Sequence, residues 1–133
     1  MTAATIDLKS KFLGGMLGCA VGDALGGPLI AMSADEIAQQ HGSVTEMTGG
    51  GRLGLSPGET TVNTGQLLCV LSSYIEIGRF DPIDMADRLL EWYRAAPRAV
   101  GHLAREAMEN LLYGYNFERA GRDAGEGLPE NMR

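Results

Sequence analysis

The sequence is poor in several features that mark common protein classes. Aromatic residues make up 6% of the chain, and two of its 133 residues are cysteines. No window shows sustained alternation of apolar and polar residues, the pattern of a half-buried strand. No run of lysine and arginine is long enough to follow a phosphate backbone, so nucleic acid is not an expected partner. Cys19 and Cys69 are predicted to be buried thiols in a reducing compartment rather than a disulfide.

The chain also lacks a dense apolar run. Its best candidate, residues 12–32, is rich in glycine and is interrupted by Asp23 and Pro28, which argues against a membrane span. A secretory signal is not expected either, because no block of leucine or valine follows the charged residues near the N-terminus. The sequence therefore predicts a cytoplasmic protein with no membrane partner.

The features that are present indicate an ordinary globular chain. Hydrophobic residues make up 44% and charged residues 21%, with a net charge of −6 and 19 glycines. This balance argues against disorder, and the length suits one hydrophobic core. We expect a single domain over residues 1–133, with residues 1–5 as a loose tail. The glycines are expected at tight turns and at close backbone approaches.

Apolar residues recurring at intervals of three and four predict an all-α, compact, orthogonal helical domain. Local start and stop signals support the individual helices. Ser33 and Glu36 form a capping-box pattern, Asp81-Pro82 is an N-cap followed by a first-turn proline, and Gly78 is a typical stop. The expected helices span residues 6–25, 33–42, 64–77, 82–96 and 100–112, with a glycine-rich loop at 43–57.

Two motifs carry the functional signal. The first is Gly-Met-Leu-Gly-Cys-Ala-Val-Gly-Asp-Ala-Leu-Gly-Gly-Pro at residues 15–28, and the second is Pro-Gly-Glu-Thr-Thr-Val-Asn-Thr-Gly-Gln at 57–66. With the segment at 41–47 and Gly78-Arg-Phe-Asp-Pro, they stand in the same order as in the ADP-ribosylglycohydrolases, the helical enzymes that remove ADP-ribose from modified proteins. The chain resembles that family from about residue 9 onward, which implies the same all-α fold.

The resemblance breaks down at the family's metal site. Its Thr-Asp-Asp unit supplies oxygen ligands to a pair of Mg²⁺ ions, and the matching residues here are Thr61, Val62 and Asn63. A valine cannot ligate a metal, and an asparagine keeps one carbonyl oxygen without the charge. Family members are also longer, with further ligands near their C-termini. We therefore expect a truncated domain that has no cofactor and a degenerate active site.

The remaining candidate ligand-binding residues are Gly22, Asp23, Thr61 and Asn63. Two interpretations stay open for them. Asp23 either orients a ligand or bonds nearby backbone N–H groups. Thr61 and Asn63 either keep part of a binding site, or one of Thr60, Thr61 and Asn63 simply caps the helix expected to start near Thr64.

The functional hypothesis that follows is a domain acting by ligand binding or by assembly. The expected partners are an ADP-ribose-like small molecule and further copies of the chain, in a homo-oligomer. Two alternatives remain: an active hydrolase of ADP-ribosyl or related glycosidic bonds, and a remnant of a longer gene that has no function of its own.

Overall fold

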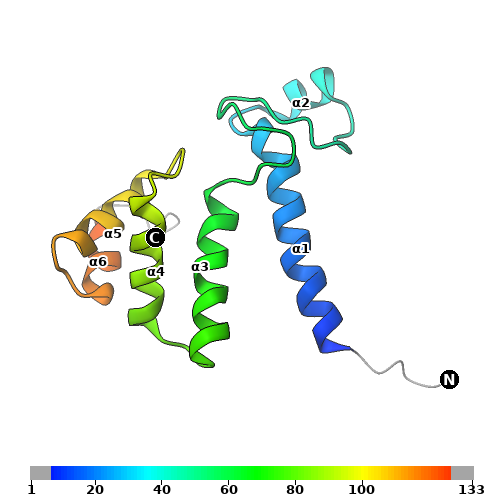
Figure 1. The fold of residues 1–133 in the computed structure, drawn as a ribbon. Helices are drawn as coiled ribbons and strands as arrows, with labels where there is room; N and C mark the ends of the chain where they lie inside the picture. The colour runs from blue at the N-terminus through cyan, green and yellow to red at the C-terminus, as the bar shows by residue number, and fades with distance from the viewer. Residues whose placement is uncertain (1–6, 127–133) are drawn as a thin grey trace. The chain divides into compact units, whose positions relative to one another are not determined.

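The computed structural model describes residues 7–126, and their regular structure is helical (Figure 1). The predicted all-α class is confirmed. Over the described range, strand-like pairing is limited to one isolated antiparallel β-bridge, between Gly50 and Leu55. The chain clusters into two compact units that meet between Thr64 and Gly65. The loose tail predicted for residues 1–5 lies outside the described residues.

The first unit is built on α1, Leu8–Gly26, which begins at an Asp7 cap and continues into a 3₁₀ turn, η1, at Gly27–Leu29. The short helix α2, Ala34–Gln40, follows. The Ser33 side chain accepts the N–H of Glu36, and the Glu36 carboxylate accepts the N–H of Ser33 at 2.7 Å. The capping box read from the sequence is therefore confirmed, since both of its bonds form between residues three apart.

A glycine-rich loop covers the C-terminal end of α1. Gly49, Gly50, Gly51 and Gly54 all have positive φ angles, which residues with a Cβ adopt at a cost. A Cβ atom at Gly51 would overlap the backbone of Pro28. Glycine at this position therefore lets the loop lie directly on the 3₁₀ turn.

The second unit contains most of α3, Val62–Ile77, and the helices α4, Pro82–Arg94, α5, His102–Leu112, and α6, Phe117–Ala124. Gly78 ends α3 with a φ of 72° and donates its N–H to the carbonyl of Tyr74. Asp81 caps α4 through the N–H groups of Ile83 and Asp84, as its Asp-Pro pair predicts. The buried apolar residues of this unit are Met85, Val100, Met108, Ala120 and Ala124.

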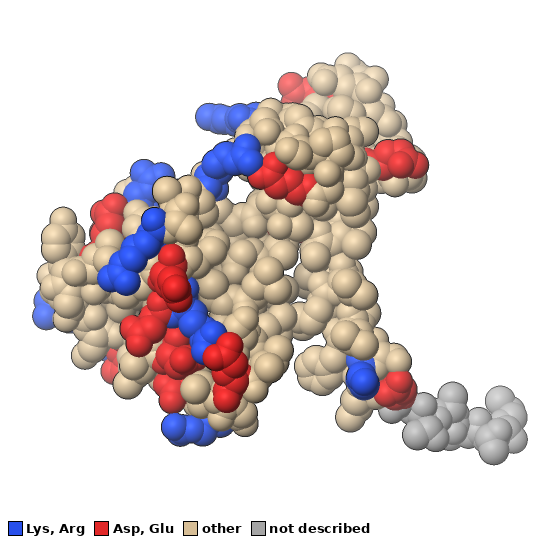
Figure 2. Space-filling model, in the orientation of Figure 1, with Lys and Arg blue, Asp and Glu red and all other residues tan. Residues whose placement is uncertain are grey.

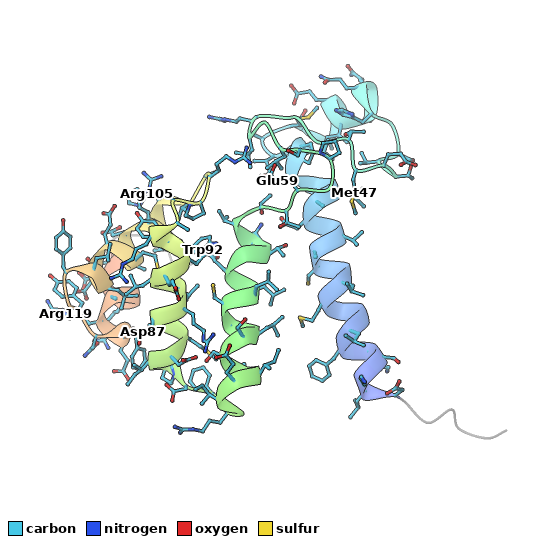
Figure 3. All side chains as sticks on the ribbon, in the orientation of Figure 1. Met47, Glu59, Asp87, Trp92, Arg105 and Arg119 are labelled. Atoms are coloured by element: carbon cyan, nitrogen blue, oxygen red, sulfur yellow. The ribbon has the colours of Figure 1, made fainter. Side chains whose placement is uncertain are left out.

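Several contacts join α3 to α4 within the second unit. The Arg88 guanidinium on α4 donates to both carboxylate oxygens of Glu76, at 2.8 and 3.2 Å, and also to Asp84. Hydrogen bonds from Arg88 lower the pKa of Glu76 and of Asp84. Gly65 on α3 faces Trp92, whose indole points toward α3 in Figure 3.

Both thiols were expected to be buried, but only that of Cys69 is partly buried. Cys69 is half-buried, its Sγ lies 3.7 Å from the carbonyl oxygen of Arg88, and burial raises the pKa of its thiol. Cys19 is exposed, and both cysteines are free. The prediction for Cys19 was wrong because the only buried residue of α1 is Ala24, near its C-terminal end.

By length and composition, the stretch Leu8–Leu29 would be able to cross a membrane, with a mean hydropathy of 1.3 over an 18-residue window. It is the one such stretch among the described residues, and a signal sequence or a core helix would pass the same test. This property alone does not overturn the expectation of a protein without a membrane partner.

The Gly65–Trp92 contact predicts a strong response to one methyl group. A Cβ atom at residue 65 would lie 2.6 Å from Nε1 and 3.2 Å from Cε2 of Trp92, and a rigid indole has little freedom to withdraw. We expect Gly65→Ala to lower the free energy of unfolding by about 1–3 kcal/mol, the usual cost of overpacking. Urea denaturation followed by tryptophan fluorescence measures it.

The matched control is Gly121→Ala in α6, where an added Cβ meets no atom within 4 Å. It should be neutral, or stabilise by up to about 1 kcal/mol, through helix propensity. Equal stability of the two variants would show that the Trp92 contact does not constrain residue 65.

Candidate functional site

The candidate site lies in the first unit, where the Asp23 carboxylate meets the start of α3. One carboxylate oxygen accepts the N–H of Thr61 at 2.8 Å and the hydroxyl of Thr64 at 2.6 Å. The other accepts the hydroxyl of Thr61 at 2.6 Å. A longer bond, 3.3 Å, comes from the N–H of Thr64. Asp23 therefore connects two segments that are 38 to 41 residues apart in the chain.

Thr61 and Asp23 accept two N–H groups of the first turn of α3, those of Asn63 and Thr64. These groups have no partner inside the helix, and a side-chain acceptor normally supplies one. The Thr61 hydroxyl oxygen also accepts the N–H of Asn63 at 3.3 Å. The capping interpretation of Thr61 is therefore confirmed, although α3 begins at Val62, two residues earlier than the sequence indicated.

Asp23 does accept backbone N–H groups, but the prediction that they lie next to it in the chain was wrong. Its partners lie across the fold, on Thr61 and Thr64. The end of a helix presents carbonyl groups, so the N–H donors to Asp23 come from the start of α3. The carbonyl of Asp23 itself accepts the N–H of Gly27.

Two effects act on the ionisation of Asp23. Partial burial raises the pKa of the carboxyl group, while hydrogen bonds from the side chains and N–H groups of Thr61 and Thr64 lower it. The hydrogen bonds outweigh burial, and the pKa lies below its ordinary value of 3.8. The carboxylate therefore stays charged at neutral pH, stabilised by donors from its own chain.

The other predicted residues differ in whether their side chains contact Asp23. Asn63 is exposed, and its amide approaches Asp23 at 3.5 Å, a weak hydrogen bond. Val62 is half-buried. Gly22 is exposed within α1, with open space where its Cβ would lie, and none of its contacts joins the cluster. The structure therefore brings Asp23, Thr61 and Asn63 together and leaves Gly22 aside.

Within residues 7–126, no group of three or more histidine, cysteine, aspartate or glutamate side chains is placed to hold a metal ion. At the start of α3 the available oxygen ligands would be the hydroxyl of Thr61, the amide oxygen of Asn63 and the carboxylate of Asp23. Only the last is charged, and four donors of the chain already occupy it within 3.3 Å. This donor set does not suit a hard divalent cation, which requires several charged oxygens.

Sequence reasoning did not identify a small pocket in the first unit. Its volume is about 210 Å³, and it lies against the end of α1 and the segment that follows α2. This is below the range of about 300–1,000 Å³ typical of drug-sized ligand sites, so it would accept only part of a nucleotide-sized molecule. The lining residues are Leu25, Leu29, His41, Ser43, Val44, Thr45, Glu46 and Thr48.

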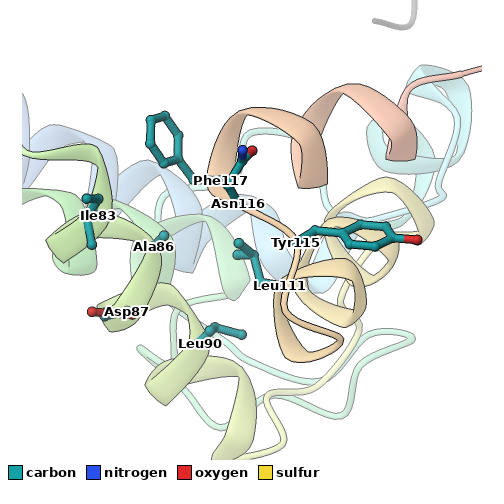
Figure 4. A pocket seen from close by; sticks show the side chains of 8 residues that line it. All are labelled: Ile83, Ala86, Asp87, Leu90, Leu111, Tyr115, Asn116 and Phe117. Carbon is teal, nitrogen blue, oxygen red and sulfur yellow. The ribbon is translucent and has the colours of Figure 1, made fainter.

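A second pocket, of about 330 Å³, lies in the second unit between α4 and the corner that joins α5 to α6 (Figure 4). Its walls are mainly apolar, with Leu90 and Leu111 facing each other across it and Asp87 at its edge. Leu90 and Ala86 both lie on α4, and each is half-buried. The pocket is therefore an incompletely filled part of the helical packing.

Comparison with known proteins gives a consistent result. The ADP-ribosylglycohydrolase family matches residues 4–131. An ADP-ribosyl-(dinitrogen reductase) glycohydrolase of Rhodospirillum rubrum is 39% identical over 106 residues, covering 80% of this chain. The ADP-ribosylarginine hydrolase Tri1 of Serratia proteamaculans is 35% identical over 109 residues, covering 77%. An uncharacterized protein of Archaeoglobus fulgidus is 36% identical over 115 residues, covering 86%.

These relatives are much longer than the matched segment. The alignments cover 36% of the Rhodospirillum protein, 28% of the Serratia protein and 38% of the Archaeoglobus protein. The chain therefore spans about a third of the length of the curated relatives it matches.

The bonds to Asp23 predict an acid-sensitive contribution to stability. Its pKa is lowered in the folded state, so its contribution is complete above the unfolded pKa and is lost as the pH falls below about 4. Hydrogen bonds to a charged group typically contribute about 1.5–3 kcal/mol. We expect Asp23→Asn to lose that order of stability at pH 7 and to show a flatter dependence between pH 4 and 2, measured by urea denaturation.

The control is Asp87→Asn, at an exposed carboxylate on α4. It should change stability at pH 7 by less than about 0.5 kcal/mol, as most surface substitutions do. Equal effects of the two substitutions would show that Asp23 does not hold the start of α3.

Proposed function

Because the chain belongs to the ADP-ribosylglycohydrolase family, we propose that it is a family domain without Mg²⁺-dependent hydrolysis of its own, which acts by ligand binding or by assembly. The observation that carries the proposal is the composition of the site at the start of α3. Val62 and Asn63 occupy the positions of the acidic pair, and Asp23 is engaged by Thr61 and Thr64.

The missing charges bear directly on the chemistry. Metal-assisted cleavage of a glycosidic bond uses the ion as a Lewis acid or to activate water, and both roles require a firmly held cation. With one carboxylate in place of a cluster, and that carboxylate saturated by hydrogen bonds, the cation would have to displace Thr61 or Thr64 in order to bind. Displacement would also expose the unpaired N–H groups of α3.

The site supports binding of an ADP-ribose-like molecule better than its cleavage. Asn63 is exposed and carries both a donor and an acceptor, and the 210 Å³ pocket adds Ser43, Thr45 and Glu46 as further polar groups of the same unit. Hydroxyl and amide groups of this kind recognise ribose hydroxyls through paired donors and acceptors.

A second candidate function is hydrolysis of ADP-ribosyl or related glycosidic bonds. The names of two relatives favour it, a glycohydrolase and an ADP-ribosylarginine hydrolase. It would require ligands from outside the matched third of their length, because the described residues of this chain do not assemble a metal cluster.

Calorimetric titration with ADP-ribose separates the two functions. We expect binding whose Kd changes by less than about twofold, or about 0.4 kcal/mol, when Mg²⁺ is added. Asn63→Ala should weaken the binding, whereas the control Gln39→Ala, at an exposed residue of α2, should leave it unchanged. Mg²⁺-dependent release of ADP-ribose from modified arginine would contradict the first function and support the second.

Restoring the acidic pair tests whether the site kept its geometry. Val62→Asp with Asn63→Asp places three carboxylates at the start of α3, where the helix dipole favours negative charge. We expect lower stability without metal, because the carboxylates repel one another and Val62 is half-buried. Affinity for Mg²⁺ or Mn²⁺ should rise at least tenfold, about 1.4 kcal/mol, without recovery of hydrolysis.

The charge-matched control is Gln39→Glu with Gln40→Glu in α2, which adds the same two negative charges away from the site. The readouts are metal titration, the thermal melt with and without metal, and an ADP-ribosyl hydrolysis assay. A folded double variant with no more affinity than this control would show that the geometry was lost with the charges. Restored hydrolysis would show that a chain spanning about a third of its relatives' length is sufficient.

A further inference from the structure

Thr64 is a residue of the candidate site to which the proposed function gives no part in ligand binding. It is buried, with 7% of its surface exposed, and both of its donors face the same carboxylate oxygen. Its hydroxyl donates to Oδ2 of Asp23 at 2.6 Å, and its N–H approaches that oxygen at 3.3 Å. We propose that Thr64 is a positioning residue, which acts through Asp23 to fix the ligand-binding amide of Asn63. The inference rests on the proposed function, in which Asn63 contacts the ligand.

The start of α3 lacks the carboxylate of a complete capping box. In α2 the Glu36 carboxylate, three residues after the N-cap, accepts the N–H of Ser33 at 2.7 Å. In α3 the N-cap is Thr61, and the residue three positions later is Thr64. The N–H of Thr61 is accepted at 2.8 Å by Asp23 instead. Asp23 therefore takes the place of the missing glutamate, and it comes from a different helix.

The Asp23 carboxylate depends on uncharged donors. It is the only charged side chain of α1 after Lys11. Figure 2 shows the visible surface of this helix without charged groups beyond its N-terminal end. Within residues 7–126, no lysine or arginine forms an ion pair with Asp23. Because a partly buried carboxylate requires hydrogen-bond donors, the two that Thr64 supplies help to fix the direction in which it faces.

The two oxygens of this carboxylate have different partners. Oδ2 accepts the Thr64 hydroxyl at 2.6 Å and the Thr61 N–H at 2.8 Å. Oδ1 accepts the Thr61 hydroxyl, and it is the oxygen that the amide nitrogen of Asn63 approaches, at 3.5 Å. By engaging Oδ2, Thr64 keeps Oδ1 directed toward Asn63. The amide nitrogen of Asn63 then faces Asp23, and its carbonyl oxygen remains available as an acceptor.

The backbone around Asn63 is held by the same arrangement. Its N–H donates to the Thr61 hydroxyl oxygen at 3.3 Å, and Thr64 is the next residue in the chain. Thr61 and Thr64 are both bonded to Asp23, so the helix turn that carries Asn63 is attached to α1 on either side of that residue. A binding group is effective when the groups around it fix its rotamer. Thr64 does this for Asn63 without contacting the ligand itself.

Two substitutions at Thr64 test this role. Thr64→Val removes the hydroxyl and keeps nearly the same shape, whereas Thr64→Ser keeps the hydroxyl. In titrations with ADP-ribose, we expect Thr64→Val to bind about fivefold more weakly, the contribution of roughly one hydrogen bond. Thr64→Ser should return the Kd to within about twofold of the original value. The matched control is Thr60→Val, the same change at a half-buried threonine of this segment, which should leave the Kd unchanged.

Nuclear magnetic resonance supplies readouts that need no ligand. In the original chain, the Thr64 hydroxyl proton should exchange slowly with water, because it is buried and bonded to a carboxylate. The side-chain amide resonances of Asn63 should shift in Thr64→Val and return in Thr64→Ser. They should not shift in Thr60→Val. A role in stability alone would lower the thermal midpoint of Thr64→Val and leave both the Asn63 resonances and the affinity of the folded protein unchanged.

Unchanged ADP-ribose affinity and unchanged Asn63 resonances in folded Thr64→Val would overturn the proposal. A rapidly exchanging Thr64 hydroxyl proton in the original chain would also overturn it, and this measurement decides even if Thr64→Val does not fold. Failure of the original chain to bind ADP-ribose would contradict the proposed function instead. The Asn63 resonances would then still confirm or overturn the positioning role of Thr64.

Discussion

The bonds between one carboxylate and the first turn of another helix determine most of the first unit. Asp23 accepts the hydroxyl groups of Thr61 and Thr64 at 2.6 Å, and the N–H of Thr61 at 2.8 Å. The segment between Asp23 and Thr61 must therefore bring the start of α3 back to the C-terminal end of α1. It does so through α2 and the glycine-rich loop, which lies on Pro28 because Gly51 has no side chain. Buried Leu55 closes the corner, and Gly27 leaves room for its side chain.

The same bonds limit the chemistry of the site. A carboxylate that satisfies four donors of its own chain has little remaining capacity for a cation or a ligand. In the function we propose, Val62 and Asn63 stand at the positions of the family's acidic pair, so this corner would lack most of the negative charge of a metal site. The Thr61 cap and the Asp23 bonds hold the start of α3 through groups of the chain itself.

The two ends of α1 differ in the contacts they make within the first unit. Its C-terminal end, from Asp23 onward, is fixed by polar bonds and by packing against the loop. From Phe12 to Gly22 it carries only apolar and small residues. A surface of this kind costs solubility unless another protein surface covers it.

The sequence alone determined what depends on neighbouring residues. The Ser33–Glu36 capping box, the Asp81-Pro82 helix start and the Gly78 stop were predicted correctly, because each acts over three or four residues. The ordered motifs were sufficient to indicate the family and to place Asp23, Thr61 and Asn63 in one site.

Only the tertiary structure decided which groups Asp23 bonds, that α3 begins at Val62, and that Cys19 is exposed. Periodicity shows that a helix face is apolar, but it does not show whether another element covers that face. The partners of Asp23 lie 38 to 41 residues away, and their approach depends on the path of the whole intervening loop. No local pattern in the sequence encodes such a distance, because it results from the packing of the loop against Pro28 and Leu55.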